Sequence, residues 1–232
     1  MPRMHSDVPG PRFLIADDHA IFAEALKVYL EPKFPVLGIV SNGRALLEAA
    51  RRLKPDVVVV DVAMPLLNGL DAARKIKKEI SEIKFVFLTM RDDPNLAAAA
   101  LELGSIAFVL KHSTGPELIT AIDHVLRGQS YLTPKLRAGD WVETQARARQ
   151  YSKELTSRQR EIVQLFAEGK SMKEIAAILE LSEKTVEFHK RHIMESHNLK
   201  SNPELILFAL RLGLITVESE LPARAAAARQ RG

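Results

Sequence analysis

Five polar residues directly follow short apolar runs of the sequence, and their types suggest one kind of chemistry. They are Asp17, Asp18, Asp61, Thr89 and Lys111. Carboxylates that gather in one place repel one another, so such a site favours a bound cation. Oxygen ligands without a thiol favour Mg²⁺ over Zn²⁺. A lysine and a hydroxyl beside the cation suit an incoming phosphoryl group.

The elements that must bring these residues together alternate along the first half of the chain. Five short runs, most of them rich in β-branched residues, indicate strands: Phe13–Ala16, Val36–Val40, Val57–Val60, Phe85–Leu88 and Ile106–Leu110. Stretches of helical period lie near residues 20–30, 44–53, 69–80, 94–103 and 116–127. This alternation predicts an α/β fold with a doubly wound, five-stranded parallel sheet. Ligands of such sheets bind beyond the carboxyl ends of the strands.

Each of the five polar residues also has a simpler interpretation. An aspartate after a strand is often only the N-cap of the next helix, and a threonine can belong to a turn. A lysine can be a solvated surface charge. The concentration of three carboxylates, a hydroxyl and a lysine at one edge of one sheet favours a functional site over these separate explanations.

Four segments carry a closer likeness. IADDH, DVAMPLLNGL, FLTM and ELGSIAFVLK resemble the signature segments of a response-regulator receiver domain, which has a flavodoxin-like sheet of strand order 2-1-3-4-5. The resemblance implies that Asp61 accepts a phosphoryl group from a sensor histidine kinase. It also implies that Asp17, Asp18 and Asp61, with the backbone carbonyl of Ala63, hold Mg²⁺.

Three further roles are implied by the resemblance alone. Lys111 is expected to pair with the phosphoryl oxygens, and Thr89 to move toward them. Phe108 stands where the family keeps an aromatic switch residue, which turns inward when the threonine moves. The chemistry agrees with these roles, because a new dianion attracts a hydroxyl group.

The second half of the chain carries no strand pattern and is predicted to be all-α. Four helical segments are expected near residues 157–168, 172–179, 183–197 and 203–212. Residues suited to N-caps precede three of them: Thr156, Ser182 and Asn202. Pro203 then falls at the first position of the last helix, where proline is tolerated.

The segment LTSRQREIVQLFAEGKSMKEIAAILELSEKTVEFHKRHIMESHNLKSNPEL resembles the LuxR-type helix-turn-helix found behind receivers of the NarL/FixJ family. In a helix-turn-helix, the second helix lies in the major groove and its exposed side contacts bases and phosphates. The candidate DNA contacts on this recognition helix are Lys184, Thr185, Glu187, Phe188, Lys190 and Arg191.

The family resemblance also implies a homodimer on DNA. The final helix is expected to contribute apolar contacts from Leu205, Leu207, Phe208 and Leu212, some of which must serve the domain's own core. The chain departs from the family pattern at several residues, among them Met90, which follows Thr89 where relatives usually have a small residue, and Glu195. Glu195 stands in MESHNLK where relatives usually carry a basic run, and it is expected to weaken contact with the DNA backbone.

The expected boundaries follow from these segments. They are a receiver at 11–130, a linker at 131–153, a helix-turn-helix domain at 154–216 and a disordered tail at 217–232. Residues 11–133 carry 15 Lys/Arg and 15 Asp/Glu, whereas residues 134–232 carry 17 and 13. The positive excess therefore lies in the C-terminal part, which favours an anionic partner there.

Composition excludes several classes of protein. Of the 232 residues, 47% are hydrophobic and 27% charged, as in globular proteins. The absence of cysteine excludes disulfides, thiolate metal sites and cysteine nucleophiles. No apolar stretch approaches the ~20 residues that cross a bilayer, and the first ten residues lack the apolar core of a signal peptide. We therefore expect a cytoplasmic protein with no membrane partner.

We interpret the sequence as a phosphorylation-gated transcription regulator and not an enzyme. Its expected partners are double-stranded DNA, a sensor histidine kinase and a second copy of the chain, with no small-molecule substrate beyond a phosphodonor. An aspartate phosphatase would need a second aspartate where Ala63 stands. A flavin carrier would need a phosphate-binding loop where the acidic segment ADDHA stands. A regulator that binds DNA without phosphorylation control remains the alternative.

Overall fold

The computed structural model describes residues 10–104, 106–137 and 154–215. The chain divides into two compact units, residues 1–154 and residues 155–232. Most of the expected linker, from residue 138 onward, and the expected tail at 217–232 lie outside the described residues. In the described ranges, the helices are too short or too polar to cross a membrane.

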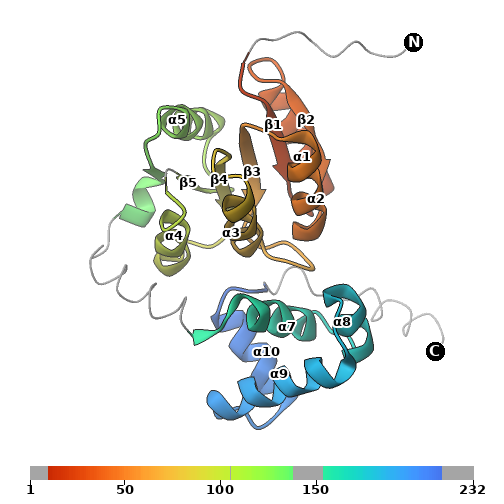
Figure 1. Cartoon of the computed structure of the whole chain (residues 1–232). Helices are drawn as coiled ribbons and strands as arrows, with labels where there is room; N and C mark the ends of the chain where they lie inside the picture. The colour runs from red at the N-terminus through yellow and green to blue at the C-terminus, as the bar shows by residue number, and fades with distance from the viewer. Residues whose placement is uncertain (1–9, 105, 138–153, 216–232) are drawn as a thin grey trace, which may run out of the picture. The chain divides into compact units, whose positions relative to one another are not determined.

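The first unit is built on a parallel sheet of six strands in the order β2-β1-β3-β4-β5-β6 (Figure 1). The strands are β1 (Phe13–Ala16), β2 (Val36–Val40), β3 (Val57–Asp61), β4 (Lys84–Thr89), β5 (Ile106–Leu110) and β6 (Tyr131–Leu132). The helices are α1 (Ala20–Leu30), α2 (Gly43–Leu53), α3 (Gly69–Glu79), α4 (Pro94–Leu101) and α5 (Gly115–Leu126). The predicted doubly wound sheet is confirmed, and its first five strands have the predicted order.

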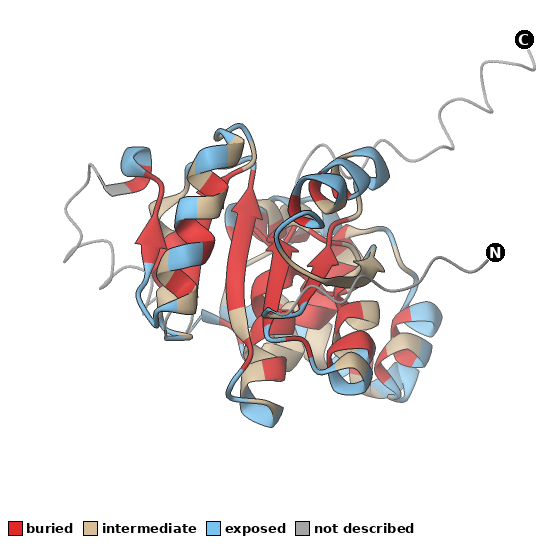
Figure 2. Ribbon diagram, turned by 90° about the horizontal axis from the view of Figure 1, so that it is seen from above, coloured by how far each residue is buried: buried red, intermediate tan, exposed pale blue. Residues whose placement is uncertain are grey.

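The strands separate two hydrophobic cores, because successive side chains of a strand point to opposite faces. In β1, Phe13 and Ile15 belong to the core that α1 and α5 cover, whereas Leu14 and Ala16 belong to the core that α2, α3 and α4 cover. Figure 2 shows buried strands between helices that expose their outer faces. Cover on both faces explains why the central strands are apolar at nearly every position.

The register of the strands brings their carboxyl ends to one edge of the sheet. Ala16 stands opposite Val60, and Thr89 stands opposite Leu110. Asp61 and Thr89 are the last residues of β3 and β4, so each of these strands ends one residue later than the sequence pattern predicted. The residues that end or follow the four inner strands therefore share this edge.

The sixth strand is a correction to the expected five-stranded sheet, and it lies where a linker was predicted. Tyr131 and Leu132 pair with β5, and the N–H of Thr133 donates to the carbonyl oxygen of Phe108 at 3.1 Å. The 3₁₀-helix η1 (Pro134–Arg137) follows directly. A two-residue strand is too short to show a sequence alternation, so tertiary pairing alone reveals it.

The second unit is all-α in its described residues, as predicted. Its helices are α7 (Ser157–Ala167), α8 (Met172–Leu179), α9 (Glu183–Ser196) and α10 (Asn202–Arg211). Apolar residues from each helix are buried, among them Ile162, Ile175, Val186 and Phe208. The helices α8 and α9, with the short turn between them, form the helix-turn-helix.

The helix starts follow local side-chain chemistry, with one correction. Thr156 and Ser182 cap α7 and α9 as predicted, and each accepts a hydrogen bond from a backbone N–H three residues on. The cap of α10 is Ser201, whose hydroxyl accepts the N–H of Glu204 at 3.4 Å. Asn202 is therefore the first helical residue instead of the cap. The sequence offered two adjacent polar residues of nearly equal capping preference, and only the backbone conformation distinguishes them.

Gly69 begins α3 directly behind the end of β3, and it provides a test of this close packing. A Cβ atom at Gly69 would overlap the carbonyl oxygen of Asp61 and lie 2.8 Å from a methyl group of Val60. We expect Gly69→Ala to lower the free energy of unfolding by about 1–3 kcal/mol through overpacking. Gly38→Ala is the control, since no heavy atom lies within 4 Å of its added Cβ. Urea unfolding measures both, and equal effects would contradict the packing argument.

Candidate functional site

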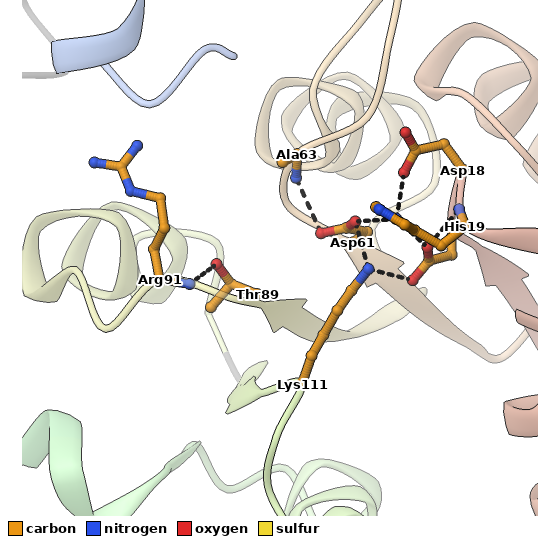
Figure 3. Close-up of polar contacts among 8 residues, drawn as sticks. Asp18, His19, Asp61, Ala63, Thr89, Arg91 and Lys111 are labelled. Atoms are coloured by element: carbon orange, nitrogen blue, oxygen red, sulfur yellow. Dashed lines mark hydrogen bonds and ion pairs between the residues drawn. The ribbon is translucent and has the colours of Figure 1, made fainter. Parts of the chain in front are cut away.

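An acidic cluster lies at the edge where β1 and β3 end (Figure 3). It consists of Asp17, Asp18, His19 and Asp61, whose candidate ligand atoms all lie within 4.8 Å of one another. The carboxylates of Asp17 and Asp61 are buried, whereas Asp18 is half-buried and His19 is exposed. The cluster therefore has a buried floor and a side that solvent reaches.

Lys111 neutralises the floor of the cluster. Its Nζ lies 2.7 Å from Oδ2 of Asp61 and 2.8 Å from Oδ2 of Asp17. The ammonium group also lies 4.8 Å from the centre of the Phe22 ring. Burial opposes the charged form of Lys111, but the two carboxylates outweigh it, and the net effect raises the pKa of Lys111 above its usual value. Lys111 is therefore a permanent cation at neutral pH.

Asp61 is held on both of its oxygens. Its Oδ2 contacts Lys111, and its Oδ1 accepts the backbone N–H of Ala63 at 3.1 Å. Burial raises the pKa of Asp61 to about 6, against the lowering effect of Lys111 and of the Ala63 N–H. The neighbouring Asp17 charge also raises it. At pH 7.5 Asp61 is thus an ionised and oriented carboxylate.

His19 is the member of the cluster that sequence reasoning missed. Its backbone N–H donates to Oδ1 of Asp17 at 2.9 Å, and its side chain lies over the carboxylates in Figure 3. The Nδ1 atom is 3.1 Å from Oδ1 of Asp18 and 3.9 Å from Oδ2 of Asp61. The only signal in the sequence was its position directly after the two aspartates of IADDH.

The structure places Thr89 and Phe108 away from the cluster. The hydroxyl of Thr89 accepts the backbone N–H of Arg91 at 3.1 Å, and in Figure 3 it points toward Arg91. Phe108 is fully buried, with its ring centre 6.2 Å from that of Phe87. The switch roles of both residues stay predictions.

The recognition helix α9 presents a polar face of mixed charge. Val186 and Ile193 are buried in the unit's core, which determines the side that α9 turns outward. Four of the predicted DNA contacts are exposed: Lys184, Glu187, Phe188 and Arg191. Phe188 is 56% exposed, and its ring stacks on that of His192 with the ring centres 6.4 Å apart.

The other two predicted DNA contacts are half-buried and touch their own unit. The hydroxyl of Thr185 lies 2.8 Å from that of Ser182 at the start of α9. The ammonium of Lys190 lies 4.7 Å from the centre of the Phe166 ring in α7. A shallow groove beside α9 is lined by both signs of charge, with Glu187 and Glu195 next to Lys190 and Arg191. Glu195 thus lies on the same groove as the candidate contacts.

Comparison with known protein families agrees with both units. Residues 13–123 match the response regulator receiver domain, and residues 153–209 match the bacterial regulatory proteins of the luxR family. A receiver sheet with this acidic edge, followed by a helix-turn-helix, defines a DNA-binding response regulator.

Individual relatives narrow this class to one family. Oxygen regulatory protein NreC of Staphylococcus carnosus (strain TM300) is 34% identical over 214 residues, which cover 88% of this chain and 99% of NreC. NreC of Staphylococcus epidermidis (strain ATCC 12228 / FDA PCI 1200) is 35% identical over 215 residues, with the same coverage. The chain belongs to the NarL/FixJ family of two-component response regulators.

Solved structures with the same domain order also resemble the chain. The RcsB response regulator of Salmonella typhimurium has a TM-score of 0.59 at 25% identity, over 88% of this chain and 98% of RcsB. RcsB of Salmonella enterica serovar Typhimurium, bound to promoter P1flhDC in the presence of phosphomimetic BeF3⁻, has a TM-score of 0.58 at 25% identity. The latter match covers 86% of this chain and 98% of RcsB.

These findings establish the general function. The chain is a response regulator of a two-component system that binds DNA, and proteins of this family are not enzymes. Receiver domains generally bind Mg²⁺ at their acidic pocket. The donor set here fits that ion, because the three aspartates offer carboxylate oxygens from two strand ends.

The raised pKa of Asp61 predicts how stability depends on pH in the absence of metal. Between its unfolded pKa of about 4 and its folded pKa of about 6, the folded state binds more protons, so lowering the pH stabilises the fold. The gain is complete below the unfolded pKa and amounts to about 3 kcal/mol.

The measurement compares urea unfolding of wild type and Asp61→Asn in EDTA from pH 7.5 to pH 4. Titrating groups that do not interact with Asp61 contribute equally to both proteins, so the difference between them reports on the Asp61 site. The stability of the Asn variant relative to wild type should therefore fall as the pH is lowered. A relative stability that does not change with pH would contradict the raised pKa.

Proposed function

We propose that this chain is a phosphorylation-gated transcription regulator of the cytoplasm. In this proposal a sensor histidine kinase phosphorylates Asp61, and the phosphorylated protein binds promoter DNA as a dimer. The observation that carries the proposal is the environment of Asp61. Its carboxylate is buried, lies 2.7 Å from Nζ of Lys111, and belongs to an acidic cluster that solvent reaches from one side.

The geometry suits transfer of a phosphoryl group to a carboxylate. An oxygen of Asp61 attacks the phosphorus, the new O–P bond forms as the N–P bond of the donor phosphohistidine breaks, and the donor imidazole keeps the electron pair and takes up a proton. The Ala63 N–H and Lys111 hold the carboxylate in place beforehand. Lys111 also neutralises the transferred oxygens. When bound among Asp17, Asp18, Asp61 and the Ala63 carbonyl, Mg²⁺ supplies further neutralisation.

A phosphoryl group at Asp61 would act on Thr89 through electrostatic attraction. A dianion there would draw the Thr89 hydroxyl away from the backbone N–H of Arg91, which it now accepts at 3.1 Å. Asp92 lies in the same connection between β4 and α4 and forms an ion pair with Lys135 of η1 at 2.7 Å. The moving loop is thus joined to the segment that leaves the sheet toward the second unit.

A second set of contacts joins that departing segment to Phe108. The N–H of Thr133 donates to the carbonyl oxygen of Phe108 at 3.1 Å. The hydroxyl of Thr133 donates to Oε1 of Glu117 at 2.8 Å, and the hydroxyl of Tyr131 donates to the same oxygen at 3.3 Å. Residues 131–137 are thus bonded to the backbone of Phe108 and, through Asp92, to the connection that follows Thr89. These contacts support gating by phosphorylation.

Dimerisation on DNA is supported by one exposed residue of α10. Leu207 is 64% exposed, whereas Leu205, Phe208 and Leu212 are buried in the unit's own core. Of the four apolar residues that the sequence suggested for a dimer contact, Leu207 is therefore the one that remains available. A solved structure that resembles the chain contains two RcsB dimers bound to two parallel DNAs, with a TM-score of 0.51 at 26% identity. Two-fold dimers match inverted repeats in DNA.

The alternative is a regulator that binds DNA without phosphorylation control. The two functions differ in one measurement. Phosphorylation control requires that beryllofluoride, a phosphoryl mimic, increases the affinity of wild type for its DNA site. Equal affinity with and without beryllofluoride, together with normal phosphorylation of Asp61, would establish the alternative.

The phosphoacceptor is tested by chemical labelling. We expect acetyl phosphate with Mg²⁺ to phosphorylate Asp61 and no other residue, since only Asp61 is both contacted by Lys111 and held by the Ala63 N–H. Borohydride reduction and mass spectrometry map the modified residue. Asp61→Asn should lose the label, and Asp123→Asn, which alters an exposed aspartate of α5, should keep it. Label at wild-type level in Asp61→Asn would refute the assignment.

The DNA-binding face is tested with Arg191, the exposed cation of the α9 groove. We expect Arg191→Ala to weaken binding by about 1–3 kcal/mol, because a base or phosphate contact is lost, and Arg191→Glu to abolish it. The probe is an inverted repeat selected from random DNA with the wild-type protein, and fluorescence anisotropy reports affinity. Lys78→Ala, which removes an exposed cation of α3, is the control. An equal effect of both alanine variants would show that binding depends on the net charge of the protein and not on the position of Arg191.

A further inference from the structure

The imidazole of His19 occupies a position that the phosphoryl-transfer chemistry described above does not use. Its Nδ1 lies 3.3 Å from Oδ1 of Asp17, 3.1 Å from Oδ1 of Asp18 and 3.9 Å from Oδ2 of Asp61. The side chain is 52% exposed, so it borders the side of the cluster that solvent reaches. The structure therefore adds one nitrogen donor to three carboxylates.

The spacing of these atoms fits ligands of a common ion. Ligands held about 2.1 Å from one metal ion stand about 3 Å apart when they are adjacent and about 4.2 Å apart when they are opposite. The three distances from Nδ1 of His19 fall within or close to this range. The backbone supports the arrangement, because the His19 N–H donates to Oδ1 of Asp17 at 2.9 Å and holds the residue beside the cluster.

We infer that His19 is a metal ligand of this site and gives it an affinity for divalent first-row transition ions in addition to Mg²⁺. Imidazole nitrogen is a preferred ligand of zinc and its neighbours in the first row, whereas Mg²⁺ prefers oxygen. In this inference the three aspartates bind both kinds of ion, whereas His19 binds only the transition ion. The inference rests on the cation site of the proposed function but not on phosphoryl transfer.

The competing explanation gives His19 the role of a counter-ion. A positively charged imidazole that only neutralised the aspartates would compete with every cation. Its removal would then strengthen the binding of Mg²⁺ and of transition ions alike. A ligand behaves differently, since its removal weakens the transition ion selectively. The ratio of the two affinities therefore separates the explanations.

The experiment measures binding of Co²⁺ and of Mg²⁺ to the full chain by titration calorimetry at fixed pH. Wild type, His19→Ala and His112→Ala are compared, and His112 serves as the control because it is exposed and outside the cluster. We expect His19→Ala to lose Co²⁺ affinity by at least about tenfold while its Mg²⁺ affinity changes less than about threefold. His112→Ala should match wild type for both ions.

A spectroscopic measurement gives a readout independent of affinity. Co²⁺ is paramagnetic, so direct ligation should shift the ring protons of His19 strongly in the NMR spectrum of wild type. Parallel changes in Co²⁺ and Mg²⁺ affinity in His19→Ala, or unshifted His19 ring protons, would overturn the inference. Labelling of Asp61 by acetyl phosphate with Mg²⁺ tests the proposed function separately, and it can succeed whether or not His19 binds metal.

Discussion

The burial of two carboxylates against one ammonium group is the constraint on which the first unit depends. Asp17 and Asp61 are both buried, and Lys111 lies within 2.8 Å of each. One cation does not compensate two buried anions, so the site retains an excess of negative charge. Burial and, to a smaller degree, the Asp17 charge raise the pKa of Asp61. The excess negative charge favours a second cation at the solvent side. Reactivity and metal binding therefore have the same physical origin.

The rest of the fold holds these charged groups in place and connects their edge of the sheet to the remainder of the chain. Two hydrophobic cores hold the strands in a register that brings the carboxyl ends of β1 and β3 to the same edge of the sheet. Gly69 allows α3 to start against the backbone of Asp61. On the far side of the sheet edge, β6 and η1 contact Phe108 and the connection that follows Thr89. Two strands, β4 and β5, thus lie between the end of β3 and the departing chain at β6.

The DNA-binding unit presents a face of mixed charge on α9. Val186 and Ile193 determine which side of α9 is outward, and the outward side carries acids as well as bases. Such a face gains less from nonspecific attraction to phosphates than a uniformly basic one. The exposed side of α9 also carries an aromatic ring, Phe188, and a carboxylate, Glu187, and side chains of both kinds can contact bases.

The sequence by itself determined the elements, the sheet order of the first five strands, the helix-turn-helix and the candidates Asp17, Asp18, Asp61 and Lys111. These follow from periodicity and from residues at strand ends, which are local properties, and from motifs that resemble one family. Only the tertiary structure decided the sixth strand, the cap at Ser201, the place of His19 and the burial of Phe108. Each of these features depends on contacts between groups that are distant in the chain or on backbone angles. A two-residue strand pairing and the direction of one side chain produce no periodic pattern in the sequence, so the sequence alone could not predict them.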